Sequence, residues 1–170
     1  INTRKHHHNK FSLPNKQFLR TPRFHRRPTM YTHPTLNTDL TRYTSDTTRR
    51  FPAGLRTFTD GSLIDREGVG ASYYDERTQQ TTYIRVDQKD ILRAELTAIL
   101  RVVQDKILDP YPLQIFIDSL ISIRLVRRWV HCPTALSTPD NLDLLDSLAH
   151  AIGQRALMRT ELYKVRAHIG

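Results

Sequence analysis

The sequence has a single cysteine, no long apolar run and, in its first 50 residues, few acidic side chains. Because Cys132 is the only cysteine, an internal disulfide is excluded and an intracellular location is expected. Apolar runs fall well short of the roughly 18 residues that a membrane helix requires, and the N-terminal segment is too polar for a signal peptide. We therefore expect a soluble protein that does not bind a membrane.

The shortage of acidic residues is confined to the first part of the chain. Residues 1–50 contain 11 basic and 2 acidic side chains, whereas residues 51–170 contain 15 of each. The net charge of +9 therefore belongs to the N-terminal segment, and the remainder is charge-balanced. Residues 1–52 show neither strand nor helix periodicity, which predicts a basic, disordered tail or linker before one globular domain at 53–170.

The basic segment has two interpretations. It is either an arm that binds nucleic acid, since dispersed Arg and Lys neutralise phosphates, or a linker from an upstream domain, which we favour. The sequence starts at Ile1, so we expect it to be a piece of a longer protein.

Residues after Pro52 predict a mixed α/β domain. Three short strands at 55–59, 68–74 and 81–86 are separated by turn residues, which indicates an antiparallel meander. Helices are expected at 92–106, 119–130 and from Thr138 to about residue 152, with a buried strand at 113–117 and a last strand at 161–167. The order β-β-β-α-β-α-α-β predicts a five-stranded sheet of three antiparallel strands and then two parallel ones, flanked by helices.

Two aspartates follow predicted strands. Asp60 comes at the end of the first strand and Asp118 at the end of the fourth, and ligands of α/β sheets gather at the carboxyl ends of strands. Either residue alone also has a structural explanation, because Asp60 precedes a glycine as in many turns and Asp118 could cap the following helix.

Glu95 lies within the apolar stripe of the predicted helix 92–106. A buried carboxylate is unfavourable unless it is paired or bound to a metal, although a structural glutamate at the edge of the stripe is an alternative. A cluster of Asp and Glu without Cys or His suits hard cations such as Mg²⁺, and Zn²⁺ is disfavoured. Two ions roughly 4 Å apart can promote phosphodiester hydrolysis without a protein nucleophile, and the sequence offers no convincing Ser-His-Asp or Cys-His set.

Four motifs resemble, in order and spacing, those of the ribonuclease H family. They are TDGS at 59–62, AEL at 94–96, IDSL at 117–120 and KVRAHIG at 164–170. They are most similar to the version attached to reverse transcriptases of non-LTR retrotransposons, and the resemblance covers about two-thirds of the chain.

The resemblance implies an endonuclease that hydrolyses the RNA strand of RNA/DNA hybrids with two Mg²⁺ ions, or with Mn²⁺. Asp60, Glu95 and Asp118 would be metal ligands, and His168 would match a mobile histidine that assists product release or proton transfer. The parent protein would carry an upstream reverse transcriptase domain.

The resemblance also implies substrate contacts. Gly61, Ser62 and Ser119 match positions where the family's backbone and small side chains meet nucleic acid. Arg124, with Arg127 and Arg128 on the same helix, forms a basic patch that either contacts phosphates, as arginine is suited to do, or is a solvated outer face.

The sequence departs from the family at its end. The family has a fourth acid on a helix after the histidine, so we expect this chain to be cut short at its C-terminus, with the last helix missing. The main alternative function is therefore an inactive, nucleic-acid-binding remnant, and a third is an integrase-like or exonuclease-like domain that acts on DNA, against which the AEL and RAH motifs argue.

Overall fold

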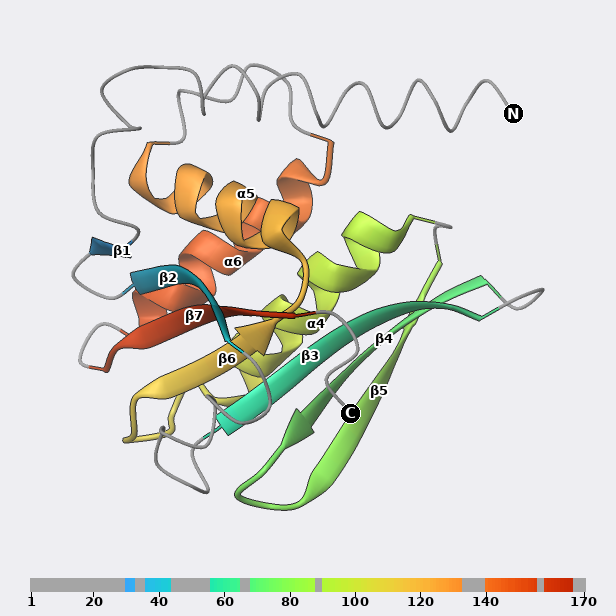
Figure 1. Ribbon diagram of the computed structural model, residues 1–170, viewed down its shortest axis with the longest axis horizontal. Coiled ribbons are helices and arrows are strands. Elements are labelled where there is room, and N and C mark those ends of the chain that lie inside the picture. The colour runs from blue at the N-terminus through green and yellow to red at the C-terminus, as the bar shows by residue number, and fades with distance from the viewer. Residues whose placement is uncertain are drawn as a thin grey trace.

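The computed structural model describes residues 30–32, 36–43, 56–64, 68–87, 90–132, 140–155 and 158–166, with only the backbone at 30–32, 40–43 and 63–64. The strands are β1 (Met30–Thr32), β2 (Leu36–Tyr43), β3 (Arg56–Ile64), β4 (Gly68–Asp75), β5 (Gln80–Val86), β6 (Leu113–Ile117) and β7 (Thr160–Val165). The helices are α4 (Ile91–Asp105), α5 (Leu120–His131) and α6 (Leu142–Gln154). Figure 1 shows the strands as one sheet with the helices packed against it.

The described strands form a mixed sheet in the order β1-β2-β7-β6-β3-β4-β5. β3, β4 and β5 pair antiparallel, and β3, β6 and β7 pair parallel. The predicted α/β architecture of three antiparallel strands followed by two parallel ones is therefore confirmed. The crossovers that contain α4, α5 and α6 bring the later strands back beside β3, so that β6 lies in the middle of the sheet.

Two further strands extend the sheet beyond the predicted five. β2 pairs parallel to β7, with Leu36 opposite Thr160, and β1 pairs antiparallel to β2. The side chain of Leu36 is fully buried in the main core, and Thr38 is also fully buried. The prediction that the whole of 1–52 is disordered is therefore wrong for residues 30–32 and 36–43. The prediction failed because the sequence of β2 is largely polar and shows no apolar alternation. The strand is stabilised instead by its backbone pairing with β7.

The main core lies between the sheet and the helices. β6 is buried along its whole length, as predicted for a central strand, and its Ile115 and Ile117 face the helices. α4 buries Leu96, Ile99 and Val103 in the same cluster. Asp90 caps α4 by accepting a hydrogen bond from the backbone N–H of Leu92. The predicted amphipathic helix at 92–106 is therefore confirmed with its apolar stripe on the sheet.

The third helix begins later than its proline signal suggested. α6 starts at Leu142 with Asn141 in the left-handed conformation before it, while Thr138 lies outside the described residues. Arg93 on α4 donates to Asp143 on α6 at 2.7 Å, an exposed ion pair between the two helices. None of the helices that the structure describes is long and apolar enough to span a membrane.

Candidate active site

Asp60 lies in the middle of β3. The Asp-Gly pair suggested that the strand ends at Asp60, but it does not. Pairing with β4 continues, with Asp60 opposite Ser72 and Gly61 opposite Ala71. Only the parallel pairing with β6 stops before it, at Phe58 opposite Phe116. Asp60 is exposed at the point where β3 runs on past the end of β6.

Asp118 follows β6 directly, as the sequence predicted. Ser119, next in the chain, is the N-cap of α5, and its Oγ accepts a hydrogen bond from the Ser122 backbone N–H at 3.2 Å. The capping role therefore belongs to Ser119 and not to Asp118. The Asp118 carboxylate is left available at the end of a buried strand, half-buried itself.

Glu95 extends from α4 toward the sheet and is only 5% exposed. The helix approaches β3 closely at this point because Gly61 has no side chain. A Cβ atom on Gly61 would lie 2.9 Å from the Glu95 backbone nitrogen and 3.1 Å from its Cγ and Cδ atoms. Gly61 therefore sets the spacing between β3 and α4, a packing role that the Asp-Gly pattern alone did not indicate.

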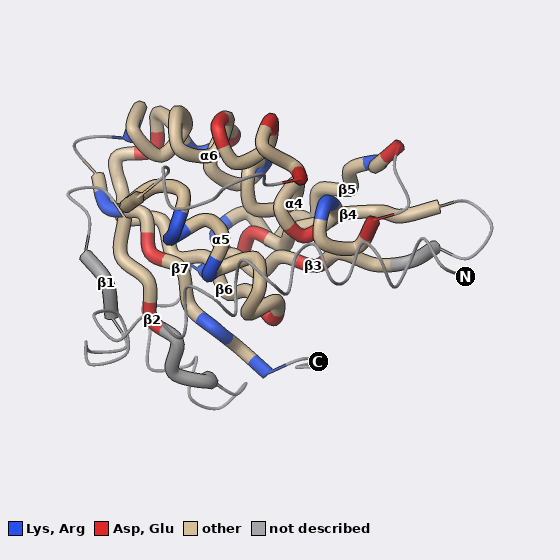
Figure 2. The backbone as a smooth tube through the Cα atoms, turned by 90° about the horizontal axis from the view of Figure 1, so that it is seen from above, with Lys and Arg blue, Asp and Glu red and all other residues tan. Residues whose placement is uncertain are grey.

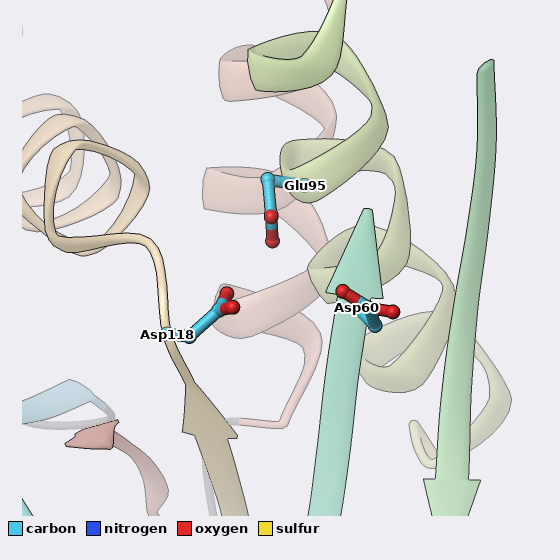
Figure 3. Close-up of side chains that lie close together, drawn as sticks. All are labelled: Asp60, Glu95 and Asp118. Atoms are coloured by element: carbon cyan, nitrogen blue, oxygen red, sulfur yellow. The ribbon is translucent and has the colours of Figure 1, made fainter. Parts of the chain in front are cut away.

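The three carboxylates meet at one place. Asp60, Glu95 and Asp118 each offer an oxygen, and these oxygens lie within 4.8 Å of one another. Figure 3 shows the three side chains converging from β3, from α4 and from the end of β6. Three negative charges at this separation repel one another unless a proton or a cation is shared among them.

Within the cluster, the pKa of Glu95 is raised. Burial raises its pKa to about 8, and the negative charges of Asp118 and Asp60 contribute in the same direction. The backbone N–H of Gly61, which interacts with the Glu95 carboxylate, opposes the rise in pKa. A metal-free site therefore holds a proton on Glu95 at neutral pH, and a bound cation would displace that proton.

The cluster contains acceptors that no protein donor satisfies. Among the residues that the structure describes, Oε2 of Glu95 and Oδ1 of Asp118 are buried and accept no hydrogen bond. Buried polar atoms are normally paired, so orphaned carboxylate oxygens that face one another suit a cation. A set made only of carboxylate oxygens fits a hard divalent ion such as Mg²⁺ or Mn²⁺.

Two hydroxyl groups that the sequence analysis did not single out hold β3 against β6. Thr57 Oγ1 donates to the Gln114 carbonyl at 2.6 Å, and Thr59 Oγ1 donates to the Phe116 carbonyl at 3.4 Å. Both threonines are buried and alternate with Phe58. Polar β-branched residues at period 2, the second of which is the first residue of the TDGS motif, were the available signal. The two bonds help to bring Asp60 and Asp118 together.

The other predicted site residues have different surroundings. Ser62 is exposed on the same face of β3 as Asp60. Arg124 lies half-buried on α5, where blue segments in Figure 2 mark the basic residues of that helix. His168 lies outside the described residues. The substrate contacts expected of these residues stay predictions.

The fold and the site together define a class of protein. A mixed sheet that joins a carboxylate on its first antiparallel strand, one on the following helix and one after the central parallel strand is typical of metal-assisted nucleases with the ribonuclease H fold. The sequence profile of the RNase H family matches residues 52–170, and the chain belongs to this family. A search of curated proteins gave no match. Family membership implies a hydrolase that acts on the RNA of RNA/DNA hybrids.

Proposed function

We propose that this chain is a divalent-metal-dependent endonuclease that hydrolyses the RNA strand of RNA/DNA hybrids, with Asp60, Glu95 and Asp118 as the metal ligands. The observation that carries the proposal is the convergence of the three carboxylates within 4.8 Å, two of them with buried oxygens that accept no hydrogen bond. Loss of the Glu95 proton when the ion enters would make all three side chains anionic ligands.

These carboxylates would hold two Mg²⁺ or Mn²⁺ ions. Such ions, when bound, would polarise the scissile phosphate and activate the attacking water. The protein's part is to place the ligands. β3 and the strand end of β6 hold Asp60 and Asp118 side by side, and the close packing at Gly61 brings Glu95 toward them. His168 is proposed to assist proton transfer or product release.

Four residues are proposed to contact the substrate beside the carboxylates. Ser62 is exposed two residues from Asp60, and Gly61 offers its backbone between them. Ser119 follows Asp118 at the start of α5, and Arg124 lies about one and a half turns further along that helix, where a guanidinium suits a phosphate.

We further propose that the chain is part of a retrotransposon-type protein with an upstream reverse transcriptase domain. The four motifs support this reading of the family. The nuclease domain would begin near residue 53, with β1 and β2 contributed by the segment that precedes it.

The test is cleavage of an end-labelled RNA/DNA hybrid by the purified chain in Mg²⁺ and in Mn²⁺, beside RNA and DNA duplexes of the same sequence. Cleavage confined to the RNA strand of the hybrid supports the proposal. Cleavage of the DNA duplex would favour the integrase-like alternative. A folded protein that binds the hybrid and cuts nothing would favour the inactive remnant.

A further inference from the structure

One face of the sheet leads from the acidic cluster across three antiparallel strands. Asp60 on β3 lies opposite Ser72 on β4, and Ser72 lies opposite Tyr83 on β5. Residues directly opposite one another in antiparallel strands point to the same face of the sheet. Because neighbouring strands are about 4.8 Å apart, Tyr83 lies roughly 10 Å from Asp60 along this row.

The row is on the face that α4 does not cover. Val69 and Ala71 of β4 and Val86 of β5 point the other way, where they pack against Ala94 and Ala98 of α4. Figure 1 shows β3, β4 and β5 side by side with α4 against one face of them. The alternate residues of β5 are Thr81, Tyr83 and Arg85, and all three are exposed. We call Asp60, Ser62, Ser72, Tyr83 and Arg85 the outer row face.

Tyr83 is the most exposed aromatic side chain of this face. It is 82% exposed, whereas Tyr73, which points toward α4, is 5% exposed and donates to Asp105 at 2.5 Å. A solvated tyrosine ring offers a flat apolar surface and a hydroxyl, which suit contact with the sugars, bases and phosphates of a nucleic acid. Tyr74, diagonal to Tyr83 on the same face, adds a second partly exposed ring.

Arg85 adds positive charge next to Tyr83. Three arginines on or near these strands and α4 are paired with acids: Arg56 with Glu76 at 2.6 Å, Arg77 of the turn after β4 with Asp109 at 2.5 Å, and Arg101 with Asp105 at 3.0 Å. Arg85 is exposed and its side chain forms no ion pair with any other residue that the structure describes. Its guanidinium therefore keeps its full capacity to bind a phosphate.

We infer that the outer row face continues the substrate site, and that Arg85 and Tyr83 bind the sugar–phosphate backbone of the nucleic acid on the β5 side of the cleaved bond. The inference rests on the proposed function, because the occupant is the same hybrid that reaches the carboxylates. Its basis is that one face of the sheet runs from the exposed Asp60 through the half-buried Ser72 to the exposed Tyr83. Beside it lies a cation that forms no ion pair with the described residues and whose charge is complementary to phosphate. Arg85 and Tyr83 are binding residues and take no part in the chemical step.

The experiment measures hybrid binding by fluorescence anisotropy at several salt concentrations, in the full chain carrying Asp118→Asn so that the substrate is not consumed. Arg85→Ala is expected to raise the Kd severalfold and to lower the slope of log Kd against log salt by about 1, since one phosphate contact is lost. Tyr83→Ala is expected to raise the Kd severalfold without changing the slope, because the tyrosine ring packs against the sugars and carries no charge.

Arg101→Ala and Tyr111→Ala are matched controls, since they remove the same side chains from other parts of the surface. In the otherwise unaltered chain, Arg85→Ala and Tyr83→Ala should raise the KM and leave the kcat at saturating hybrid unchanged. Unchanged Kd and salt slope in both variants, with normal binding by the parent, would overturn this inference and leave the proposed function in place. Absence of hybrid binding by the parent would overturn both.

Discussion

At the scale of single residues, the acidic cluster combines burial with negative charge. Glu95 is buried beside two aspartates, and its pKa is raised to about 8 in the metal-free protein. The cluster is therefore unfavourable for folding as it stands and favourable for binding a divalent cation. Such a conflict between stability and chemistry is common at active sites.

Asp118→Asn is expected to abolish cleavage of the hybrid while the fold is retained. The amide keeps the shape of the side chain but removes a negative ligand from the proposed metal site. The measurement is the rate of hybrid cleavage together with the circular dichroism spectrum. Asp143→Asn, which changes an exposed aspartate paired with Arg93, is the control and should keep full activity. Cleavage at the parent rate by Asp118→Asn would contradict the metal-ligand assignment.

Glu95→Gln should stabilise the metal-free protein at pH 8. Folded protein retains the Glu95 proton up to about pH 8, whereas the unfolded chain loses it near the ordinary value of 4.5. The free energy of unfolding of the parent therefore falls as pH rises between these values, and glutamine removes this contribution. We expect a gain of about 4 kcal/mol at pH 8 and little difference at pH 4.5, by urea unfolding in EDTA. Parallel curves of stability against pH for parent and variant would contradict the assignment of the raised pKa.

Gly61→Ala should destabilise the fold and weaken the site. The added methyl group would lie 2.9 Å from the backbone nitrogen of Glu95, and backbone cannot move aside as a flexible side chain can. We expect a loss of about 1–3 kcal/mol in urea unfolding, with weaker cleavage. Gly153→Ala is the control, since nothing lies within 4 Å of its Cβ position on α6, and it should be neutral or slightly stabilising.

At the scale of elements, the strands and helices with a strong hydrophobic pattern were predictable. β6 was placed at residues 113–117 from its apolar run, and α4 within one residue at each end from its stripe. The sequence did not predict that the pairing of β3 with β4 continues past Asp60. An Asp-Gly pair is typical of a turn, but here both residues lie within the paired part of β3. β2 was missed because its sequence has no apolar alternation and its partner, β7, is distant in the chain.

The residues of the candidate site could be predicted from the sequence, but the distances between them could not. The strand ends and the apolar stripe pointed to Asp60, Glu95 and Asp118, and the structure brings their oxygens within 4.8 Å of one another. The role of Gly61 in spacing α4 from β3 depends on a distance between two elements, which local pattern does not encode. The same is true of the face that joins Asp60 to Tyr83, which requires the strand register.

Leu36→Ala should lower the stability of the whole domain if β2 is an integral strand. The side chain of Leu36 is fully buried in the cluster that also contains Ile115 and Leu162. Removing it leaves a cavity, and we expect a loss of about 2–5 kcal/mol in urea unfolding. Leu108→Ala is the control, because Leu108 is 94% exposed. Equal stability of the two variants would show that β2 is dispensable.

At the scale of the whole molecule, metal binding and folding should be coupled. Mg²⁺ that binds only the folded protein stabilises it by about 2.7 kcal/mol at 100 times its Kd. We expect Mg²⁺ to raise the Tm and EDTA to reverse the effect, with a smaller shift in Asp118→Asn, by differential scanning calorimetry. A Tm that does not respond to Mg²⁺ or Mn²⁺ in the parent would contradict a metal site at the acidic cluster.

The parallel pairing of β2 with β7 also bears on the order in which the chain can fold during synthesis. Residue 36 leaves the ribosome long before residue 160, yet the two lie opposite each other in the sheet. β1 can pair with one edge of β2 early, but among the described strands only β7 pairs with the other edge, so the backbone groups of that edge must remain solvated until β7 emerges. β3, β4, β5 and α4 can associate earlier because they are close in sequence. During translation the acidic strand β3 and the helix α4 therefore emerge and can associate first, and β6 is joined to β2 only when β7 follows.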